Sequence, residues 1–364
     1  MLKRFEAEGF KNFQKRIVID FSDVHDYKFN KECVTDGLLS KIIVYGKNSV
    51  GKTNLGLAIF DVVSHLTDRN VTPVLYDYYL NANTLDSAKF RYVFEFRNDT
   101  IDYRYIKDKK RSLLYEEILI NNELLFNYDY STKKGNYTGL KVLNPSLVLD
   151  FESLESVLRY IINNTKLDDT HPLRKMMKYV SSMLWFRNLD ENRYIGYKSN
   201  TKDYLDFVFE NDTLEEFQEF LYASGINDKL SVKTDPDGVK RLYIDSKVPM
   251  PFLKTASSGT KALYTFFYWY KTAQDVSLMF IDEFDAYYHY ELSESIVKLL
   301  EKMTNTQVIL TSHNTNLLSN RIMRPDCYFI LTKDKLTSLV NATDRELREG
   351  HNLEKLYMSG EFNE

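Results

Sequence analysis

The sequence predicts an α/β fold in which a largely parallel sheet is joined to an antiparallel one. From residue 257 onward, helical and extended patterns alternate along the chain, as a parallel sheet with crossover helices requires. Near the N-terminus, an apolar strand at 39–45 leads through a glycine-containing turn into a segment with helical spacing at 53–66. Between these parts, residues 90–125 alternate apolar and polar side chains, which indicates an antiparallel meander.

The individual elements follow from the same patterns. The strand at 39–45 contains Ile42, Ile43 and Val44, and a continuous apolar run is typical of a strand buried on both faces. A hairpin is expected at 230–244, because Asp235-Pro236-Asp237-Gly238 is a strong turn sequence. Further strands are expected at 2–9, 15–21, 277–281, 307–311 and 328–332, and further helices at 258–270 and 292–303.

The same patterns divide the chain into three parts. Residues 1–150 are expected to form the first part of the core together with the antiparallel meander. Residues 151–250 are expected to form a mainly helical insertion lobe, because the pattern from 152 to 224 is mostly helical. Residues 251–364 would then complete the core, which is therefore split in the sequence.

Bulk composition excludes several classes of protein. A chain of 364 residues can form one large or two modest domains. Its net charge of -4 lacks the basic excess of a dedicated nucleic-acid-binding domain, but a net charge is a sum and leaves a local basic face on one side of a dimer open. No apolar run of about eighteen residues occurs and the first residues lack a secretory core, so we expect a cytoplasmic protein with no membrane partner. Cys33 and Cys327 are too few for a disulfide framework or a structural zinc site.

The turn after the strand at 39–45 is a phosphate-binding loop. Its sequence, Gly46-Lys47-Asn48-Ser49-Val50-Gly51-Lys52-Thr53, fits the pattern G-x-x-x-x-G-K-[ST]. In this pattern the glycines let backbone N–H groups close around the β-phosphate, Lys52 reaches the β- and γ-oxygens, and the Thr53 hydroxyl binds Mg²⁺. A buried strand before the loop and a helix after it are the context that the motif needs. We therefore expect ATP and Mg²⁺ as ligands.

Two later strands end in side chains suited to chemistry on a phosphate. The strand at 278–281 is followed by Asp282, expected to hold Mg²⁺ through water, and by Glu283, expected to polarise the attacking water as general base. His313 follows the next strand, where its ring could reach the γ-phosphate. Each signal is weak alone, since many strands end in solvated acids, but both come downstream of a phosphate loop.

A fourth element is a hydroxyl-rich turn before the helix at 258–270. It reads Thr255-Ala256-Ser257-Ser258-Gly259-Thr260. A helix N-terminus with unpaired N–H groups and serine hydroxyls binds anions. N-capping of the helix explains the same residues, so both interpretations stay open.

In this order and spacing, the four elements resemble the head of ABC-type ATPases. The closer likeness is to stand-alone AAA-family ATPases of the OLD and abortive-infection group, which serve in bacterial anti-phage defence. The resemblance covers both ends of the chain and leaves the middle uncovered. The residues that carry it are the phosphate loop, Ser257-Ser258-Gly259-Thr260, Asp282-Glu283-Phe284-Asp285-Ala286 with His289, Thr311-Ser312-His313-Asn314-Thr315-Asn316-Leu317-Leu318 and Asn352-Leu353-Glu354-Lys355-Leu356-Tyr357-Met358-Ser359-Gly360.

This resemblance implies a homodimer joined through its ATP sites. Ser257 and Gly259 would cover the γ-phosphate held by the other subunit, Asp285 would line the dimer contact, and His313 would be the switch residue. The implied function is that of a sensor or regulator of a separately encoded effector, a nuclease or toxin, because no nuclease motif follows residue 320. ABC heads usually carry a Gln after an early strand, and this chain has none between Asn54 and Phe217. Either another polar side chain serves in its place or hydrolysis is slow, and slow hydrolysis is the expectation here.

Several alternatives remain to be separated. The main one is a DNA-binding ATPase of the RecF and SMC kind in repair or chromosome maintenance, and another is a nucleotide-gated scaffold without turnover. A GTPase is disfavoured because Thr332-Lys333-Asp334-Lys335 lacks the final Asp of N/T-K-x-D. A small-molecule kinase would have no use for the turn at Ser257 or for His313, and a transporter would need a membrane partner. The basic cluster of Lys107, Lys109, Lys110 and Arg111 is interpreted as a solvated hairpin turn, with nucleic-acid contact as the alternative.

Overall fold

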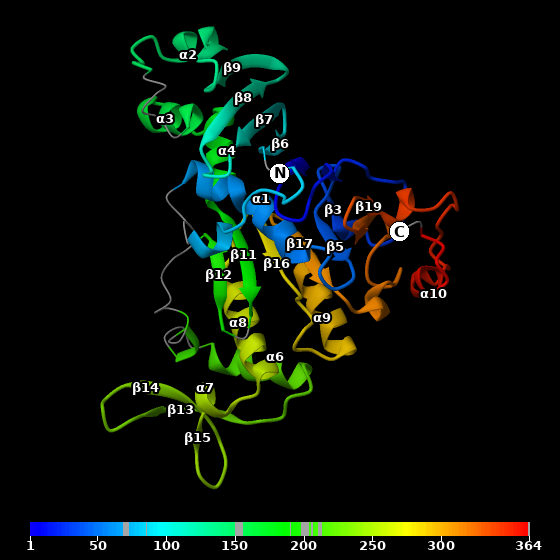
Figure 1. Ribbon diagram of the computed structural model, residues 1–364. Coiled ribbons are helices and arrows are strands. Elements are labelled where there is room, and N and C mark those ends of the chain that lie inside the picture. The colour runs from blue at the N-terminus through cyan, green and yellow to red at the C-terminus, as the bar shows by residue number, and fades with distance from the viewer. Residues whose placement is uncertain are drawn as a thin grey trace.

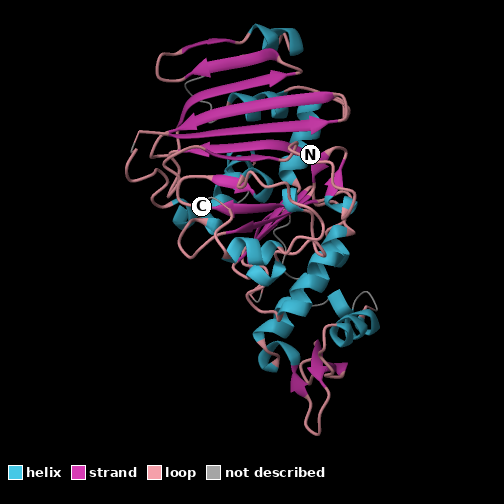
Figure 2. Ribbon diagram, turned by 90° about the vertical axis from the view of Figure 1, so that its right-hand side faces the viewer, coloured by secondary structure: helices cyan, strands magenta, loops and turns pink. Residues whose placement is uncertain are grey.

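The computed structural model describes residues 1–67, 73–84, 86–149, 156–189, 191–197, 204, 207–209 and 213–362. An antiparallel sheet forms one end of the molecule, an α/β sheet lies in the middle, and a small three-stranded sheet forms the opposite end (Figures 1 and 2). None of the helices in these residues is long and apolar enough to cross a membrane.

The described strands and helices have the following bounds. The strands are β1 (Leu2–Glu8), β2 (Ile17–Asp20), β3 (Val34–Thr35), β4 (Leu38–Leu39), β5 (Lys41–Tyr45), β6 (Ala88–Phe96), β7 (Asp99–Lys107), β8 (Leu113–Ile120), β9 (Glu123–Asp129), β10 (Lys134–Asn136), β11 (Met183–Asn188), β12 (Arg193–Gly196), β13 (Leu230–Thr234), β14 (Lys240–Ile244), β15 (Met250–Pro251), β16 (Leu278–Ile281), β17 (Gln307–Ser312), β18 (Tyr328–Leu331) and β19 (Leu336–Ser338). The α-helices are α1 (Lys52–Leu66), α2 (Thr138–Leu143), α3 (Val157–Asn164), α4 (Pro172–Ser181), α6 (Leu214–Ala223), α7 (Phe252–Thr255), α8 (Ser258–Thr272), α9 (Tyr290–Glu301) and α10 (Leu353–Met358).

The α/β sheet confirms the parallel core that the sequence predicts. Its strand order is β12-β11-β16-β17-β5-β18-β19. The five inner strands run parallel, whereas β12 and β19 pair antiparallel at the two edges. Every residue of β5, β16, β17 and β18 is buried, as expected for strands covered on both faces. The predicted helices at 53–66, 258–270 and 292–303 are confirmed as α1, α8 and α9.

The antiparallel sheet confirms the predicted meander and extends it. Its order is β10-β9-β8-β7-β6-β1-β2, so the two N-terminal strands pair with the meander rather than with the α/β sheet. Between β8 and β9, Asn121 and Asn122 have positive φ angles of 53° and 65°. Asparagine tolerates this region, and two such residues in succession make the tight turn that joins neighbouring strands.

Helix α1 lies between the two sheets and is buried along most of its length. On one side, the ring of Phe60 lies 5.9 Å from that of Trp185 in β11. On the other side, the Tyr92 hydroxyl of β6 donates to the Ala58 carbonyl oxygen at 2.8 Å. Since α1 begins at the end of the phosphate loop, this packing holds the loop against both sheets.

The interpretation of residues 151–250 as a mainly helical lobe is wrong for one segment. Residues 183–196 form β11 and β12, and β11 pairs in parallel with β16 inside the α/β sheet. The run Met183-Leu184-Trp185-Phe186 is apolar throughout, and a short apolar run does not distinguish a buried strand from a buried helix. The expected boundary at residue 150 and the expected helix start at 152 lie outside the described residues. The hairpin at 230–244 is confirmed as β13 and β14.

Candidate nucleotide-binding site

The predicted site residues lie at the carboxyl ends of three neighbouring parallel strands. In the order β16-β17-β5, Asp282 and Glu283 follow β16, His313 follows β17 and the phosphate loop follows β5. The carboxyl ends of parallel strands share one edge of the sheet, where α/β proteins bind ligands. His313 therefore lies between the acidic pair and the phosphate loop, in contact with both.

The phosphate loop has the backbone that its glycines allow. Gly51 has φ of 107° and is the N-cap of α1, and Ser49 has φ of 66°. A Cβ on Gly46 would lie 2.6 Å from Val50 Cγ2 and 2.9 Å from the Leu331 carbonyl oxygen. Any side chain at 46 would therefore push the loop away from the end of β18.

Asn12, which the sequence analysis did not single out, supports the loop from the N-terminal segment. Its Nδ2 donates to the Val50 carbonyl oxygen at 2.6 Å, and its Oδ1 accepts from Asn54 Nδ2 at 2.7 Å. A Cβ on Gly51 would meet the Asn12 carboxamide at 2.3 Å. This asparagine thus requires glycine at 51 and fixes the turn into α1. An asparagine close to the phosphate loop in space, but far from it in sequence, leaves no local signal.

Lys52 is directed at the middle of the site. Its Nζ donates to the Gly46 carbonyl oxygen at 3.1 Å and lies 2.7 Å from His313 Nε2. Burial lowers the pKa of the Lys52 ammonium, while the carboxylates of Glu283 and Asp282 act in the opposite direction. The same His313 nitrogen lies 3.1 Å from Glu283 Oε1. The lysine, the histidine and the glutamate therefore form one continuous polar contact.

Thr53 and Asp282, the predicted Mg²⁺ ligands, are in direct contact. The Thr53 hydroxyl donates to Asp282 Oδ2 at 2.6 Å, and the Thr311 hydroxyl donates to Asp282 Oδ1 at 2.7 Å. Burial raises the pKa of Asp282, and the two hydroxyl hydrogen bonds partly offset the effect. Both carboxylate oxygens are thus oriented by neighbours.

This donor set fits Mg²⁺ bound together with phosphate. Mg²⁺ prefers oxygen ligands, keeps several waters and is often held by one or two protein oxygens plus substrate phosphates. The described residues contain no cluster of three or more His, Cys, Asp or Glu side chains that could hold a metal by themselves. A hydroxyl and a carboxylate beside a phosphate loop are the oxygens such a site needs.

Glu283 has a backbone conformation that residues other than glycine rarely adopt. Its φ is 45°, in the left-handed region, where a residue other than glycine is strained. Its backbone N–H donates to the Thr311 hydroxyl at 2.7 Å. Thr311 therefore orients both acids, one through its carboxylate and one through its backbone. The sequence did not predict this role, although Thr311 is the last residue of the strand expected at 307–311.

Asp285 lies at the same edge, in contact with the segment that carries His313. The Ser312 hydroxyl donates to Asp285 Oδ2 at 2.8 Å. Burial raises the pKa of Asp285, and the Ser312 hydrogen bond acts against that effect. Its expected place in a dimer contact stays a prediction.

The turn at Ser257 is the N-cap of α8. Ser257 Oγ accepts a hydrogen bond from the Thr260 N–H at 3.1 Å, so the capping interpretation is confirmed. A Cβ on Gly259 would lie 2.8 Å from the Tyr287 carbonyl oxygen. Ser257 and Ser258 are exposed. Helix α8 lies near α6 and α7, toward the end of the molecule that carries the three-stranded sheet (Figure 1). The binding of a phosphate by this turn stays a prediction.

The basic cluster at 107–111 is not the solvated turn that the sequence suggested. Lys107 is only 3% exposed, and its Nζ donates to Asp61 Oδ2 of α1 at 2.6 Å. The Arg111 guanidinium lies 3.9 Å from the centre of the Tyr76 ring. Only Lys109 and Lys110 are exposed as expected. Lys107 thus ties the antiparallel sheet to α1.

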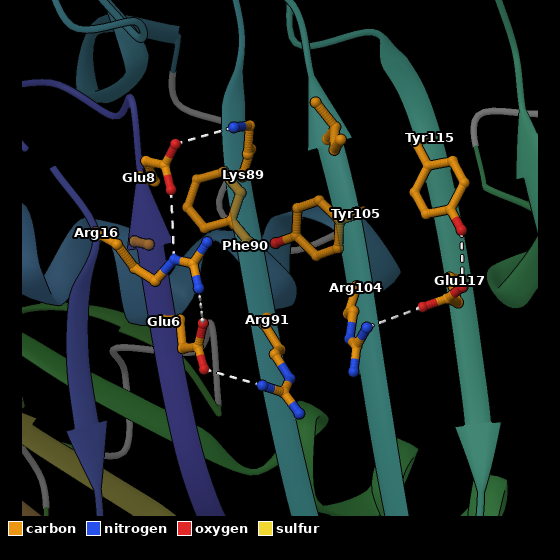
Figure 3. A pocket seen from close by; sticks show the side chains of 12 residues that line it. Glu6, Glu8, Arg16, Lys89, Phe90, Arg91, Arg104, Tyr105, Tyr115 and Glu117 are labelled. Carbon is orange, nitrogen blue, oxygen red and sulfur yellow. Dashed lines mark hydrogen bonds and ion pairs between the residues drawn. The ribbon is translucent and has the colours of Figure 1, made fainter. Parts of the chain in front are cut away.

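A second depression, of about 410 Å³, lies on the outer face of the antiparallel sheet. Figure 3 shows acidic and basic side chains joined in pairs across it. Arg91 pairs with Glu6 at 3.0 Å, and Lys89 pairs with Glu8 at 2.9 Å. Arg16, Lys89, Arg91 and Arg104 line the depression, and each of them is already ion-paired with an acid. These cations are therefore engaged within the protein, unlike Lys52 at the phosphate loop.

The fold and the site together define a P-loop ATPase domain of the α/β class. The chain belongs to the family described as "AAA domain, putative AbiEii toxin, Type IV TA system", whose model matches residues 41–319. The match spans the phosphate loop, Asp282, Glu283 and His313, so the family that the motifs indicated is confirmed. P-loop ATPases of this kind bind ATP with Mg²⁺.

Solved structures with a similar fold include heads of SMC proteins. One is an SMC head bound to the C-winged helix domain of ScpA, with 15% identity, a TM-score of 0.45 and coverage of 93% of this chain and 97% of that one. Another is the SMC head domain from Thermotoga maritima, with 14% identity, a TM-score of 0.46 and coverage of 93% and 98%. A third is the Pyrococcus furiosus Smc head with an extended coiled coil, with 13% identity, a TM-score of 0.42 and coverage of 93% and 96%. No curated protein matches the chain significantly.

Proposed function

We propose that this protein is an ABC-type ATPase that binds and slowly hydrolyses ATP at a dimer interface. In this role it acts as sensor or regulator of a separately encoded effector in bacterial anti-phage defence. The observation that supports hydrolysis most directly is the continuous contact from Lys52 through His313 to Glu283, next to the Thr53–Asp282 pair. Family membership supports the link to toxin systems.

The proposed chemistry assigns one task to each side chain. Bound Mg²⁺ would neutralise negative charge on the phosphates of ATP, and attack of water on the γ-phosphorus breaks its bond to the β-phosphate, with ADP as the leaving group. Lys52 would donate to the terminal phosphate oxygens, the Thr53 hydroxyl would bind the metal, and Asp282 would hold it through water. Glu283 accepts a proton from the attacking water, and His313, between Glu283 and Lys52, orients the carboxylate.

Asn188 is our candidate for the position where related heads carry a glutamine. It is the last residue of β11, the strand beside β16, so its carboxamide lies at the edge of the sheet that carries Asp282. Its Oδ1 accepts from the Tyr287 hydroxyl at 2.9 Å. A shorter amide in this position is consistent with slow turnover.

Substitution of the general base tests hydrolysis and dimerisation together. Glu283→Gln should keep ATP binding, lower phosphate release about 100- to 10,000-fold, and trap an ATP-dependent dimer. Phosphate release and light scattering coupled to gel filtration measure these outcomes. The matched control is Glu291→Gln, at an exposed acid in the first turn of α9. Unchanged release in Glu283→Gln would show that another group is the base.

The effector is tested separately from the ATPase. Co-expression with the product of the neighbouring gene should give a complex that survives gel filtration. The DNA-repair alternative predicts instead that the isolated protein binds duplex DNA, with an affinity that falls steeply as salt increases. Salt-sensitive DNA binding without a protein complex would overturn the proposed role.

A further inference from the structure

A small pocket adjoins the phosphate loop on the side away from the catalytic residues. It has a volume of about 250 Å³ and is lined by Gly46 and Val50 of the loop, Leu331 and Thr332 at the end of β18, and Tyr357 of α10. Lys47 and Lys333 also line it, and both are exposed. The pocket therefore joins the first residue of the phosphate loop to the C-terminal helix. Neither the catalytic residues nor the predicted dimer contact uses it.

The strand order indicates which end of a nucleotide lies there. β5 has β17 on one side and β18 on the other. The residues suited to the terminal phosphate, Asp282, Glu283 and His313, follow β16 and β17. In ATP the terminal phosphate and the base are at opposite ends of the molecule. A nucleotide that lies along this edge of the sheet with its terminal phosphate at β17 therefore has its base on the β18 side.

The lining of the pocket suits a planar aromatic base. Val50 and Leu331 are buried and apolar, and the half-buried Tyr357 contributes an aromatic ring. Bases stack on aromatic side chains because every base has a π-face. Pockets for whole ligands usually measure about 300–1,000 Å³. A pocket of about 250 Å³ beside the loop thus has room for one end of a ligand.

Helix α10, which carries Tyr357, is held by contacts that lead back to the segment after His313. Asn352 caps α10 by accepting from the Lys355 N–H at 2.8 Å, and Leu353 is fully buried. The Thr315 hydroxyl, two residues beyond His313, donates to Glu354 Oε1 at 3.3 Å. The helix that carries Tyr357 is therefore attached to the segment that follows the switch histidine.

We propose that this pocket binds the base of the nucleotide, with Tyr357 stacked on it. The inference rests on the proposed function, because it needs the phosphates of ATP in the loop. The inference assigns a role to the C-terminal helix α10, which would bind the base while Lys52 binds the phosphates.

Isothermal titration calorimetry with two ligands separates the base from the phosphates. The full-length protein is titrated with the non-hydrolysable analogue AMP-PNP and with inorganic tripolyphosphate, both with Mg²⁺. Tyr357→Ala should weaken AMP-PNP binding about 5- to 150-fold, the range for one stacked base, and leave tripolyphosphate binding unchanged. Tyr357→Phe should bind like the wild type. The control is Met358→Ala, at a side chain that is 72% exposed on the same helix.

The outcomes distinguish this inference from the proposed function. A wild-type protein that binds neither ligand would refute the proposed ATPase. Wild-type binding of both ligands, with Tyr357→Ala either harmless or equally damaging to both, would refute the base site alone. Photolabelling with 8-azido-ATP is the second readout, and it should mark the tryptic peptides 322–333 or 356–364. Label confined to residues 1–20 would place the base elsewhere and overturn the inference.

Discussion

Thr311 offers the sharpest test of how the acids at the proposed catalytic edge of the sheet are oriented. Its hydroxyl donates to Asp282 Oδ1 and accepts from the Glu283 N–H, both at 2.7 Å, and the side chain is fully buried. Thr311→Val keeps the size of the side chain and removes only the hydroxyl. The carboxylate and the backbone N–H would then each lose a partner.

The size of the effect follows from these two hydrogen bonds. A hydrogen bond to a charged group contributes about 1.5–3 kcal/mol, and an N–H left without a partner adds to the loss, so we expect about 2–4 kcal/mol in the free energy of unfolding. With an unfolding entropy of about 2.1 cal/mol/K per residue, a chain of 364 residues should lose about 3–5 °C in Tm. Phosphate release should fall about 10- to 100-fold, as for residues that orient metal ligands.

Differential scanning fluorimetry and phosphate release measure these changes. Thr311→Ser keeps the hydroxyl and should retain most of the thermal stability and most of the rate of phosphate release. Thr306→Val is the matched control, since the Thr306 hydroxyl is buried at the other end of β17 and donates to the Val276 carbonyl oxygen at 2.8 Å. It should lower Tm and leave turnover intact. If both valine variants lowered turnover equally, the assignment of Thr311 to the orientation of the acids would be wrong.

Three further predictions address other parts of the molecule. Lys107→Met should destabilise the fold by about 3–5 kcal/mol, because it leaves the fully buried Asp61 carboxylate without its cation, and chemical denaturation should show a smaller loss for Lys107→Met combined with Asp61→Leu. Gly259→Val should prevent the proposed ATP-dependent dimer while ATP affinity is kept, because the new side chain would collide with the Tyr287 carbonyl oxygen. Light scattering measures the dimer, and a dimer as stable as that of the wild type would contradict this expectation. Because burial raises the pKa of Asp282, its carboxylate becomes protonated at a higher pH than that of an exposed aspartate. Mg²⁺-dependent ATP affinity should therefore fall as the pH is lowered, whereas Asp282→Asn should show weak affinity without this pH dependence.

The sequence predicted those parts of the site that depend on contiguous residues. The phosphate loop and the start of α1 occupy residues 46–53, so their geometry follows from local backbone preferences and from glycine at 46 and 51. The strands before Asp282 and His313 are apolar runs, and their burial in a parallel sheet follows from the alternation with helices. The order of these motifs was sufficient to indicate the ATPase family that the match at 41–319 confirms.

Other features depend on which strands become neighbours. β11 was missed because four apolar residues fit a helix as well as a strand, and only its pairing with β16 resolves the choice. Lys107 was misjudged because it follows the pattern of an exposed hairpin, whereas its carboxylate partner lies 46 positions away on α1.

By itself, the sequence determined the α/β class, the phosphate loop, the acidic pair and the family. The tertiary structure decided how these parts meet: β17 lies between β16 and β5 and so brings His313 between Lys52 and Glu283, and Asn12 and Thr311 support the loop and the acids. The physical reason is the distance in sequence over which the deciding interactions act. A motif of eight residues is governed by local dihedral preferences, while contacts such as that between Thr53 and Asp282, 229 positions apart, exist only after long-range burial has selected the order of strands.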